Sequence, residues 1–246
     1  MEFMNFFKYL IIRIFKSEVV VYTRINDIRK FYCKSKIEYF RTAQYGGEKE
    51  FLSEFMTYLK PNDVLWDIGS SIGIVSIYAA PLIKKVIAFE PDKLIFNRLS
   101  KNISLNKLGS KIQSLNLGIG ETKGTISLHS DGVEGKSPSI ANLGRHNTSY
   151  IVEIETIDNL VESGYEKPTI IKIDIEGAEM LALLGARKVF LDTHKPRLLF
   201  IEVHPTFLPS FNTSIEEIYD FLFQNGYTFI KCVERDEQIH IIAKNV

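Results

Sequence analysis

From about residue 60 onward, short apolar runs of strand length alternate with runs of helical periodicity. The strand-length runs are rich in Ile, Leu, Val and Phe without polar alternation, and they cover residues 64–68, 86–90, 112–117, 170–174 and 198–203. Helical patterns cover residues 72–80, 92–106, 178–191 and 215–225. Strands without polar alternation are those buried on both faces, and strand–helix alternation builds right-handed crossover units. The sequence therefore predicts an α/β fold with a doubly wound, mostly parallel sheet.

Two pairs of segments depart from this simple alternation. Residues 125–129 and 150–155 alternate apolar and polar side chains around the polar loop 131–148, which predicts a small inserted β-hairpin within about 122–156. Loops as long as 131–148 often act as lids or binding loops. Residues 227–233 and 238–243 are joined by a charged turn, which predicts an antiparallel hairpin at the C-terminus.

The N-terminal segment 3–15 is strongly apolar but too short to span a membrane. Its spacing predicts an amphipathic helix whose stripe is made by Phe3, Phe7, Leu10, Ile11 and Ile14. Two interpretations stay open. The stripe packs against the main domain or a partner chain, or it lies on a membrane surface with Lys8, Arg13 and Lys16 facing the head groups. We predict an N-terminal helical extension over 1–47 and a main domain over 48–246.

The overall charge limits the partners of the chain. Lys and Arg number 30, and Asp and Glu also number 30, so the formal net charge is zero. A neutral chain supplies no long-range attraction for phosphate backbones, which disfavours a general nucleic-acid binder. The two cysteines, Cys33 and Cys232, offer neither a disulfide framework nor metal-ligand spacing, and so few cysteines are typical of a cytoplasmic protein.

A glycine turn follows the first strand and opens the first helix. Gly69 and Gly73 let the backbone approach a ligand closely at an amide-rich helix N-terminus. Ser71 stands where a dinucleotide fingerprint has its second glycine, which makes room for a pyrophosphate. Asp67, just before the turn, suits a cationic amino group and repels phosphates. Glu90 ends the second strand, 23 residues after Asp67, near the offset at which an acidic residue meets ribose hydroxyls.

A cluster of charged residues follows the fourth buried strand. Asp174 is expected at the carboxyl edge of the sheet, where ligands bind in doubly wound folds. Glu176 and Glu179 share a helix face if the helix begins near residue 177, and Lys172 alternates to the face of Asp174 and is a candidate to neutralise it. This pattern indicates substrate positioning, base catalysis or a divalent-metal site. Alternatively, the acidic residues are simply favoured by the helix dipole.

The fifth buried strand ends in a glutamate and a histidine. Alternation places Glu202 and His204 on one side of this strand, at its carboxyl end. A histidine that is neutral at pH 7 accepts a proton from a substrate hydroxyl, so His204 is a candidate general base. Arg145 and His146 are expected to touch substrate if loop 131–148 folds over the site. His194 and His240 are interpreted as surface or strand positions.

Segments 67–73, 89–92 and 171–179 resemble the three signature blocks of the FkbM-type S-adenosylmethionine-dependent methyltransferases. Segment 155–160 is similar to that family's lead-in to the third block, and the resemblance runs from about residue 48 to the C-terminus. It implies a seven-stranded Rossmann-like methyltransferase sheet whose last two strands form the predicted C-terminal hairpin. It also implies S-adenosylmethionine as cofactor, with the candidate binding residues Asp67, Gly69, Ser70, Ser71, Gly73, Glu90 and Asn116. Ser70 and Ser71 depart from the family's usual alanine and asparagine.

The expected activity is methyl transfer from S-adenosylmethionine to an oxygen or nitrogen atom. The resemblance favours a hydroxyl on a small molecule, sugar or glycan. The candidate catalytic residues are Asp174, Glu176 and His204, and the same three are the candidates for a divalent metal ion. The alternatives are a non-catalytic scaffold that keeps the cofactor site and an NAD-dependent oxidoreductase. We further expect an acidic rim at one sheet edge with the basic residues elsewhere, which disfavours a polyanionic acceptor.

Overall fold

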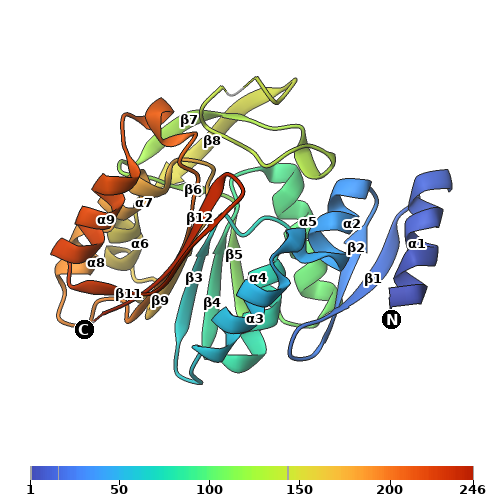
Figure 1. The fold of residues 1–246 in the computed structure, drawn as a ribbon, viewed down its shortest axis with the longest axis horizontal. Helices are drawn as coiled ribbons and strands as arrows, with labels where there is room; N and C mark the ends of the chain where they lie inside the picture. Colours follow the sequence, from blue (N-terminus) through green and yellow to red (C-terminus); the bar gives the residue numbers. More distant parts are fainter. Residues whose placement is uncertain (1, 16, 143, 246) are drawn as a thin grey trace.

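The computed structural model describes residues 2–15, 17–142 and 144–245. Its centre is a seven-stranded sheet in the order β11-β12-β10-β9-β3-β4-β5 (Figure 1). The strands are β3 (Val64–Ile68), β4 (Lys85–Phe89), β5 (Ile112–Leu115), β9 (Ile170–Ile173), β10 (Leu198–Val203), β11 (Tyr227–Arg235) and β12 (Gln238–Asn245). β12 is antiparallel to both of its neighbours, β10 and β11, and the other pairings are parallel. The predicted sheet and C-terminal hairpin are confirmed.

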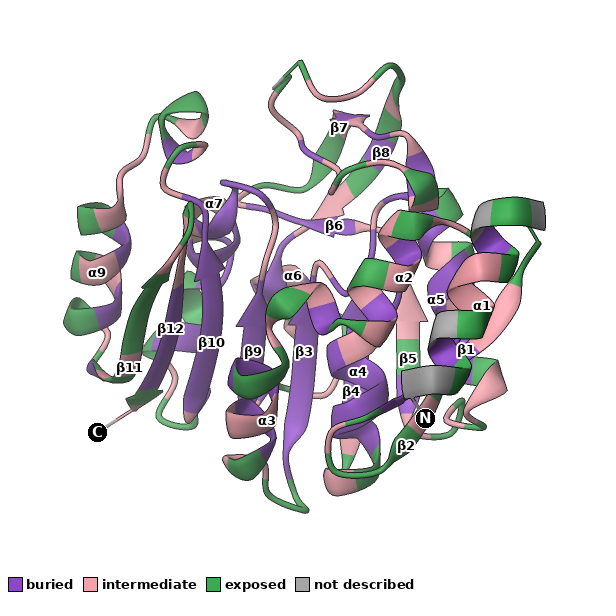
Figure 2. Cartoon of the chain, turned by 45° about the vertical axis from the view of Figure 1, so that its right-hand side comes forward, coloured by how far each residue is buried: buried purple, intermediate pink, exposed green. Residues whose placement is uncertain are grey.

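Helices cover both faces of this sheet, as a doubly wound fold requires. One hydrophobic core lies under α3 (Lys49–Thr57), α4 (Ile74–Ala79) and α5 (Lys93–Leu105). A second core lies under α6 (Ile157–Glu162), α7 (Glu179–Leu184), α8 (Arg187–Leu191) and α9 (Ile215–Gln224). Figure 2 shows the central strands buried and the outward faces of α3 and α9 exposed. The sheet is therefore buried on both faces, which explains the lack of polar alternation in its strands.

The helix predicted over 178–191 is wrong in one respect, because the structure divides it into α7 and α8. A Cβ atom on Gly185 would lie 2.1 Å from the carbonyl oxygen of Gly120, so the chain can pass this point only with a glycine. The carbonyl of Gly185 accepts a hydrogen bond from Asp158 at 3.0 Å instead of continuing the helix. Since α7 begins at Glu179, Glu176 lies in the preceding turn, and the two glutamates do not share a helix face.

The inserted hairpin is confirmed and is larger than predicted. β7 (Gly124–His129) pairs antiparallel with β8 (Ser149–Glu155), and the two-residue strand β6 (Gly118–Ile119) adds to β8 in parallel. A strand of two residues carries no periodicity, so β6 could not be predicted from the sequence. This small sheet lies beyond the carboxyl ends of the central strands (Figure 1).

The N-terminal extension is only partly helical, so that prediction is wrong in part. α1 (Glu2–Phe15) and α2 (Lys36–Ala43) flank an antiparallel hairpin of β1 (Val19–Arg24) and β2 (Ile28–Cys33). Val21, Phe31 and Cys33 are fully buried in the core beneath α3, α4 and α5. The extension therefore contributes to the hydrophobic core of the main domain.

The helix α1 turns its polar side toward this hairpin. Asn5 is buried and donates a hydrogen bond to the carbonyl of Tyr22 at 2.6 Å, and Lys8 donates to the carbonyl of Val20 at 2.5 Å. Lys8 therefore points into the protein, and its expected contact with head groups is wrong.

The apolar stripe of α1 faces outward instead of packing on the main domain. Phe7, Ile11 and Ile14 are exposed, whereas Ile12 is buried. The side chains of Phe3, Arg13 and Lys16 lie outside the described residues. Among the described helices, none has the length and apolar character needed to cross a bilayer. Contact of the stripe with a membrane surface remains a prediction, and a chain that fails to co-sediment with anionic vesicles would contradict it.

Candidate active site

Two cavities open at the carboxyl ends of the parallel strands. The smaller, of about 80 Å³, has mostly apolar walls from β4, β6, β7 and β8 and three carboxylates, those of Glu90, Asp174 and Glu176. The larger, of about 860 Å³, lies between the N-terminal extension, β10 and the turn that joins β11 to β12. The residues that line both cavities are Gly69, Ser71, Ser137, Asp174 and Glu176. The two cavities therefore meet at the glycine turn and at the end of β9.

The glycine turn packs directly against the end of β9. Gly69 has a φ of +76°, and a Cβ atom there would lie 1.9 Å from the carbonyl oxygen of Asp174. The backbone amides of Gly69 and Ser70 both donate to the carbonyl of Phe89, at 3.1 and 2.9 Å. Gly73 has a φ of +93° and packs against Leu99 of α5. Glycine at positions 69 and 73 thus serves close packing around the cavity as well as backbone freedom.

Ser71 takes a backbone conformation that disfavours a side chain. Its φ is +50°, in the left-handed region, and its amide donates to Oε2 of Glu90 at 2.9 Å. Left-handed backbone in a residue other than glycine costs about 1–2 kcal/mol. The strain lies where both cavities meet, at the position of the second glycine in a dinucleotide fingerprint.

We expect Ser71→Gly to raise the free energy of unfolding by up to about 1 kcal/mol, because glycine removes the strain but adds freedom to the unfolded chain. Chemical denaturation of both proteins measures the difference. Ser70→Gly is the matched control, because Ser70 lies outside the residues of positive φ and its hydroxyl donates to the carbonyl of Phe89 at 3.1 Å. Ser70→Gly should lose stability, because it removes a hydrogen bond and relieves no strain. If Ser71→Gly loses as much stability as Ser70→Gly, the backbone of Ser71 is not strained.

Glu90 lies where a ribose-binding carboxylate is expected. Its side chain is buried, and each oxygen accepts one backbone amide, from Ser71 and from Asp92, both at 2.9 Å. Burial raises the pKa of Glu90 to about 8. A carboxylate oxygen has a second lone pair, so both oxygens retain capacity for sugar hydroxyls. Apolar walls beside a buried carboxylate are features with which proteins hold the base and the ribose of a nucleoside.

Asp67 and Asn116 lie behind the cavity walls, so their expected direct contact with the cofactor is not supported. Asp67 is fully buried, accepts a hydrogen bond from Ser76 at 2.5 Å and lines neither cavity. Asn116 is exposed and donates to the carbonyls of Glu90 and Pro91, at 2.9 and 3.0 Å. Asp67 supports the glycine turn through its contacts with Ser76 and Lys172. Asn116 fixes the segment that carries Glu90 through its two hydrogen bonds.

Lys172 joins the carboxylates beneath the site. Its ammonium is buried and donates to the carbonyl of Gly69 at 3.0 Å and to Asp174 at 3.2 Å, and Asp67 lies 3.5 Å away. Burial opposes the charge on Lys172, but Asp174 and Asp67 together raise its pKa above the ordinary value. Burial likewise opposes the charge on Asp174, but Lys172 and then His204 lower its pKa. The expectation that Lys172 neutralises Asp174 is confirmed.

His204 is not the neutral base that we expected. Its Nδ1 lies 3.0 Å from the fully buried carboxylate of Glu179, and its Nε2 lies 3.6 Å from Glu202 and 3.9 Å from Glu176. Burial opposes the charged ring, but the hydrogen bond to Glu179 raises the pKa of His204 to about 10. The ring is therefore an imidazolium at neutral pH. The glutamate that causes this belongs to α7, whose start the sequence placed differently.

Basic side chains also face the larger cavity, so the expected separation of acidic and basic residues is wrong. Arg41, Arg145 and Arg235 line it together with the acidic groups. Arg145 comes from the loop 131–148 and contacts Glu176 at 2.9 Å, so the loop folds over the site as predicted. His146 instead faces the carbonyl of Ser137 at 3.0 Å and lines neither cavity.

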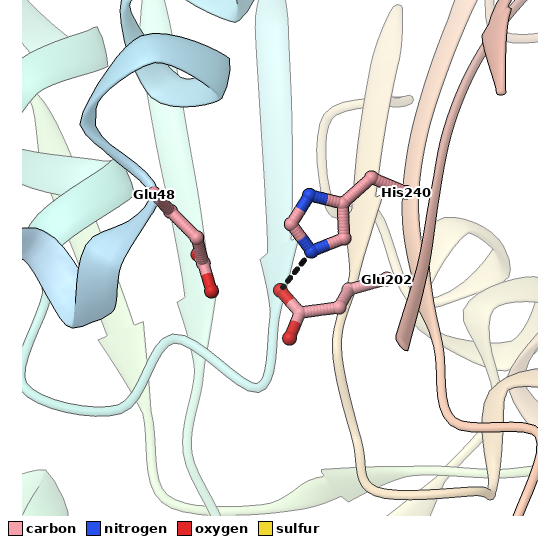
Figure 3. A group of neighbouring side chains, drawn as sticks. All are labelled: Glu48, Glu202 and His240. Carbon is pink, nitrogen blue, oxygen red and sulfur yellow. Dashed lines mark ion pairs between the residues drawn. The ribbon is translucent and has the colours of Figure 1, made fainter. Parts of the chain in front are cut away.

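The candidate metal ligands are grouped differently from the prediction. Within the described part of the chain, ligand atoms of Asp174 and His204 come together with Glu202 rather than with Glu176. A second group is formed by Glu48, Glu202 and His240 (Figure 3). His240 was interpreted as a surface or strand position. It lies on β12 and is buried, and its pairing with Glu202 across the strands could not be read from the sequence.

A seven-stranded doubly wound sheet with one reversed strand, and a glycine turn beside a buried carboxylate at the end of the next strand, are the features of a Rossmann-like methyltransferase. The fold is similar to that of an rRNA methylase from Streptococcus thermophilus, with a TM-score of 0.52 at 12% identity over 80% of this chain and 95% of that chain. The FkbM methyltransferase domain matches residues 67–229. The chain belongs to the FkbM methyltransferase family.

Two relatives in this family are similar over most of their length. The hexuronic acid methyltransferase AglP of Haloferax volcanii is 31% identical over 180 residues, which cover 71% of this chain and 70% of that protein. The methyltransferase sdnD of Sordaria araneosa is 25% identical over 213 residues, which cover 69% and 80% of the two chains. These similarities leave the NAD-dependent alternative without support.

Proposed function

We propose that this protein transfers a methyl group from S-adenosylmethionine to a hydroxyl of a sugar. The observation that carries the proposal is the junction of the two cavities at Asp174. The smaller cavity has mostly apolar walls with Glu90 among them, the larger carries many charged groups, and Asp174 lines both. A donor nucleoside in the first and an acceptor in the second therefore bring their reacting ends together beside this carboxylate.

The chain offers a distinct group of residues for each part of the donor. The apolar walls of the smaller cavity take the base, Glu90 takes the ribose hydroxyls, and the turn at Gly69 and Ser71 takes the amino-acid part. The bound donor supplies a methyl group activated by a positively charged sulfur. The protein's contribution is to align the acceptor oxygen with that methyl group and to exclude water.

Asp174 is the group that receives the hydroxyl proton in this proposal. His204 is protonated, and Glu176 is occupied by Arg145. The pKa of Asp174 is lowered, so it is a weak base. A weak base suffices here, because the oxygen becomes strongly acidic once its bond to the methyl carbon forms. Asp174 orients the hydroxyl first and takes the proton as the carbon–sulfur bond breaks.

The lining of the larger cavity supports a sugar that carries a carboxylate. Phe40, Tyr45 and Phe207 offer aromatic faces, and Arg41 and Arg145 offer guanidinium groups. Nη1 of Arg41 and Nε of Arg145 are buried without a hydrogen-bond partner in the described residues. Arginine recognises carboxylates through paired hydrogen bonds, and the relative AglP is named for a hexuronic acid.

The proposal predicts methylation of p-nitrophenyl glucuronide in preference to p-nitrophenyl glucoside, followed by mass spectrometry with S-adenosylmethionine as donor. Arg41→Met should raise KM for the glucuronide by about tenfold or more, since a charge-assisted hydrogen bond contributes about 1.5–3 kcal/mol. It should leave KM for the glucoside unchanged. If the chain binds S-adenosylhomocysteine but methylates neither sugar, the proposal of a sugar acceptor is wrong. If it methylates both sugars equally well, the proposed preference for a sugar with a carboxylate is wrong.

A further inference from the structure

We propose that Glu48, Glu202 and His240 form a binding site for one divalent metal ion of the first transition row. One ligand atom from each residue lies within 4.8 Å of the others (Figure 3). Ligand atoms that share an ion at ~2.1 Å lie roughly 3–4.5 Å apart. Small side-chain movements therefore bring the three groups onto one ion.

The fold brings two of these ligands together by strand pairing. Glu202 on β10 lies directly opposite His240 on β12 in the antiparallel register. Paired residues place their side chains on the same face of a sheet, and Nε2 of His240 lies 3.6 Å from Oε2 of Glu202. Both residues are nearly fully buried, at 5% and 2% exposure. Glu48 approaches from the chain segment just before α3, on the other side of the group (Figure 3).

His240 supplies the observation that points to a ligand. Its Nε2 is buried and has no hydrogen-bond partner among the described residues, although it is aimed at the two carboxylates. Buried polar atoms in native proteins are rarely left without a partner. The ring of Phe51 lies 4.4 Å from that of His240 and fixes its orientation. A metal ion between the three residues would satisfy this nitrogen.

The surrounding charges decide which oxygen atoms are available. Oε1 of Glu202 faces His204 at 3.6 Å, which leaves Oε2 for the ion. Arg235 contacts Oε1 of Glu48 at 3.3 Å, so Oε2 of Glu48 is the oxygen that we assign to the ion. The group of Asp174, Glu202 and His204 is the weaker candidate, because Nε2 of His204 already has Nε2 of Gln238 as a partner at 3.2 Å, whereas Nε2 of His240 has no hydrogen-bond partner among the described residues.

The ligand types narrow the choice of metal. One imidazole and two carboxylates suit Mn²⁺, Fe²⁺, Co²⁺ or Zn²⁺ better than Mg²⁺ or Ca²⁺, which prefer oxygen alone. Glu48 and Glu202 line the larger cavity, so the ion has open positions toward an acceptor. That further role, holding an acceptor oxygen, rests on the proposed function, whereas the binding of the ion does not.

The test is a titration of the metal-free chain with Mn²⁺, followed by the paramagnetic resonance signal of the free ion, and with Zn²⁺ against a competing dye. We expect about one ion per chain. Glu202→Gln and His240→Gln should each weaken binding by at least about tenfold. Glu48→Gln tests the third ligand and is half-buried, so its loss leaves the fold intact. Thermal unfolding midpoints of all variants confirm that they are folded.

Two matched controls separate the site from general acidity. Glu237→Gln changes another cavity glutamate, and His194→Gln changes a histidine whose side chain is 91% exposed. Both should bind the ion as the wild-type chain does. The site would be overturned if the wild-type chain showed no saturable binding below about 1 mM. It would also be overturned if Glu48→Gln and Glu202→Gln both bound the ion as tightly as the wild-type chain does. If the chain transfers methyl groups but binds no metal ion, the metal site is wrong and the proposed function stands. If the chain binds the ion but transfers no methyl group, the proposed function is wrong and the metal site stands.

Discussion

Asp174→Asn should lower the rate of methyl transfer by about 10²–10⁴-fold, the usual contribution of a positioned acid or base. Asparagine keeps the shape of the side chain but cannot take the proton from the acceptor hydroxyl. The residue lies where the two cavities meet, so the loss should appear in kcat. Affinity for S-adenosylhomocysteine, measured by calorimetry, should change only a few-fold, because Glu90 and the apolar walls hold the nucleoside in the proposed function.

Asp236→Asn is the matched control, because Asp236 is an exposed aspartate that lines the same larger cavity away from the smaller one. It should keep its full rate. A fall in kcat with cofactor binding retained would also exclude a non-catalytic scaffold, since a scaffold has no turnover to lose. An Asp174→Asn variant that turns over at the wild-type rate would show that another group, or water, accepts the proton.

The central sheet could be predicted from the sequence because its signal is local. Residues 64–68 and 198–203 are apolar apart from one acidic residue each, and the structure gives β3 and β10 these bounds. Burial on both faces makes such runs recognisable without knowledge of their neighbours. The turn at Gly69 was recognisable for the same reason, since its glycines follow directly from a strand.

The sequence could predict a site residue only where the type and chain position of that single residue decide what it does. Glu90 lies where its distance along the chain from the glycine turn placed it. The state of His204 was not predictable, because it depends on Glu179, which lies 25 residues earlier in the chain. The orientation of α1 was missed because a short hairpin, rather than the main sheet, offers its polar groups to Asn5 and Lys8. Pairings across distant segments decide such features, and periodicity within one segment does not report them.

The pairing of Glu202 with His240 illustrates the same limit for metal ligands. In the sequence the two residues are separated by a helix and a strand, and Glu48 lies in the segment before the main sheet. No ligand spacing links them. Only the reversed direction of β12 brings His240 opposite Glu202.

Lys172→Met should lower the free energy of unfolding by about 3–5 kcal/mol, because breaking a buried ion pair leaves its partners uncompensated. Asp67 should be affected most, because its side chain is entirely buried. Its polar neighbours are Lys172 at 3.5 Å and Ser76 at 2.5 Å. Methionine preserves the length and the apolar stem of the lysine. Urea denaturation of the wild-type and variant chains measures the difference.

The loss should depend on pH with a sign that identifies the carboxylates as its cause. Without Lys172, burial raises the pKa of Asp174 in the folded chain above its value of about 3.9 in the unfolded chain. A group of raised pKa favours folding only while it is protonated, so the variant loses stability as the pH rises from about 4 to 7. The wild-type chain should show a smaller fall, because its charged Lys172 keeps the pKa of Asp174 low, whereas the raised pKa values of Glu48 and Glu90 act in both chains.

Two further variants complete the argument. Lys231→Met removes a half-exposed ammonium paired with Glu54 and should cost at most about 1 kcal/mol, as surface pairs do. Asp67→Asn in the Lys172→Met background removes one of the stranded carboxylates and should recover part of the stability, most of all above pH 6. If Lys172→Met costs no more than Lys231→Met, the ammonium is not what holds Asp67 and Asp174 together beneath the glycine turn.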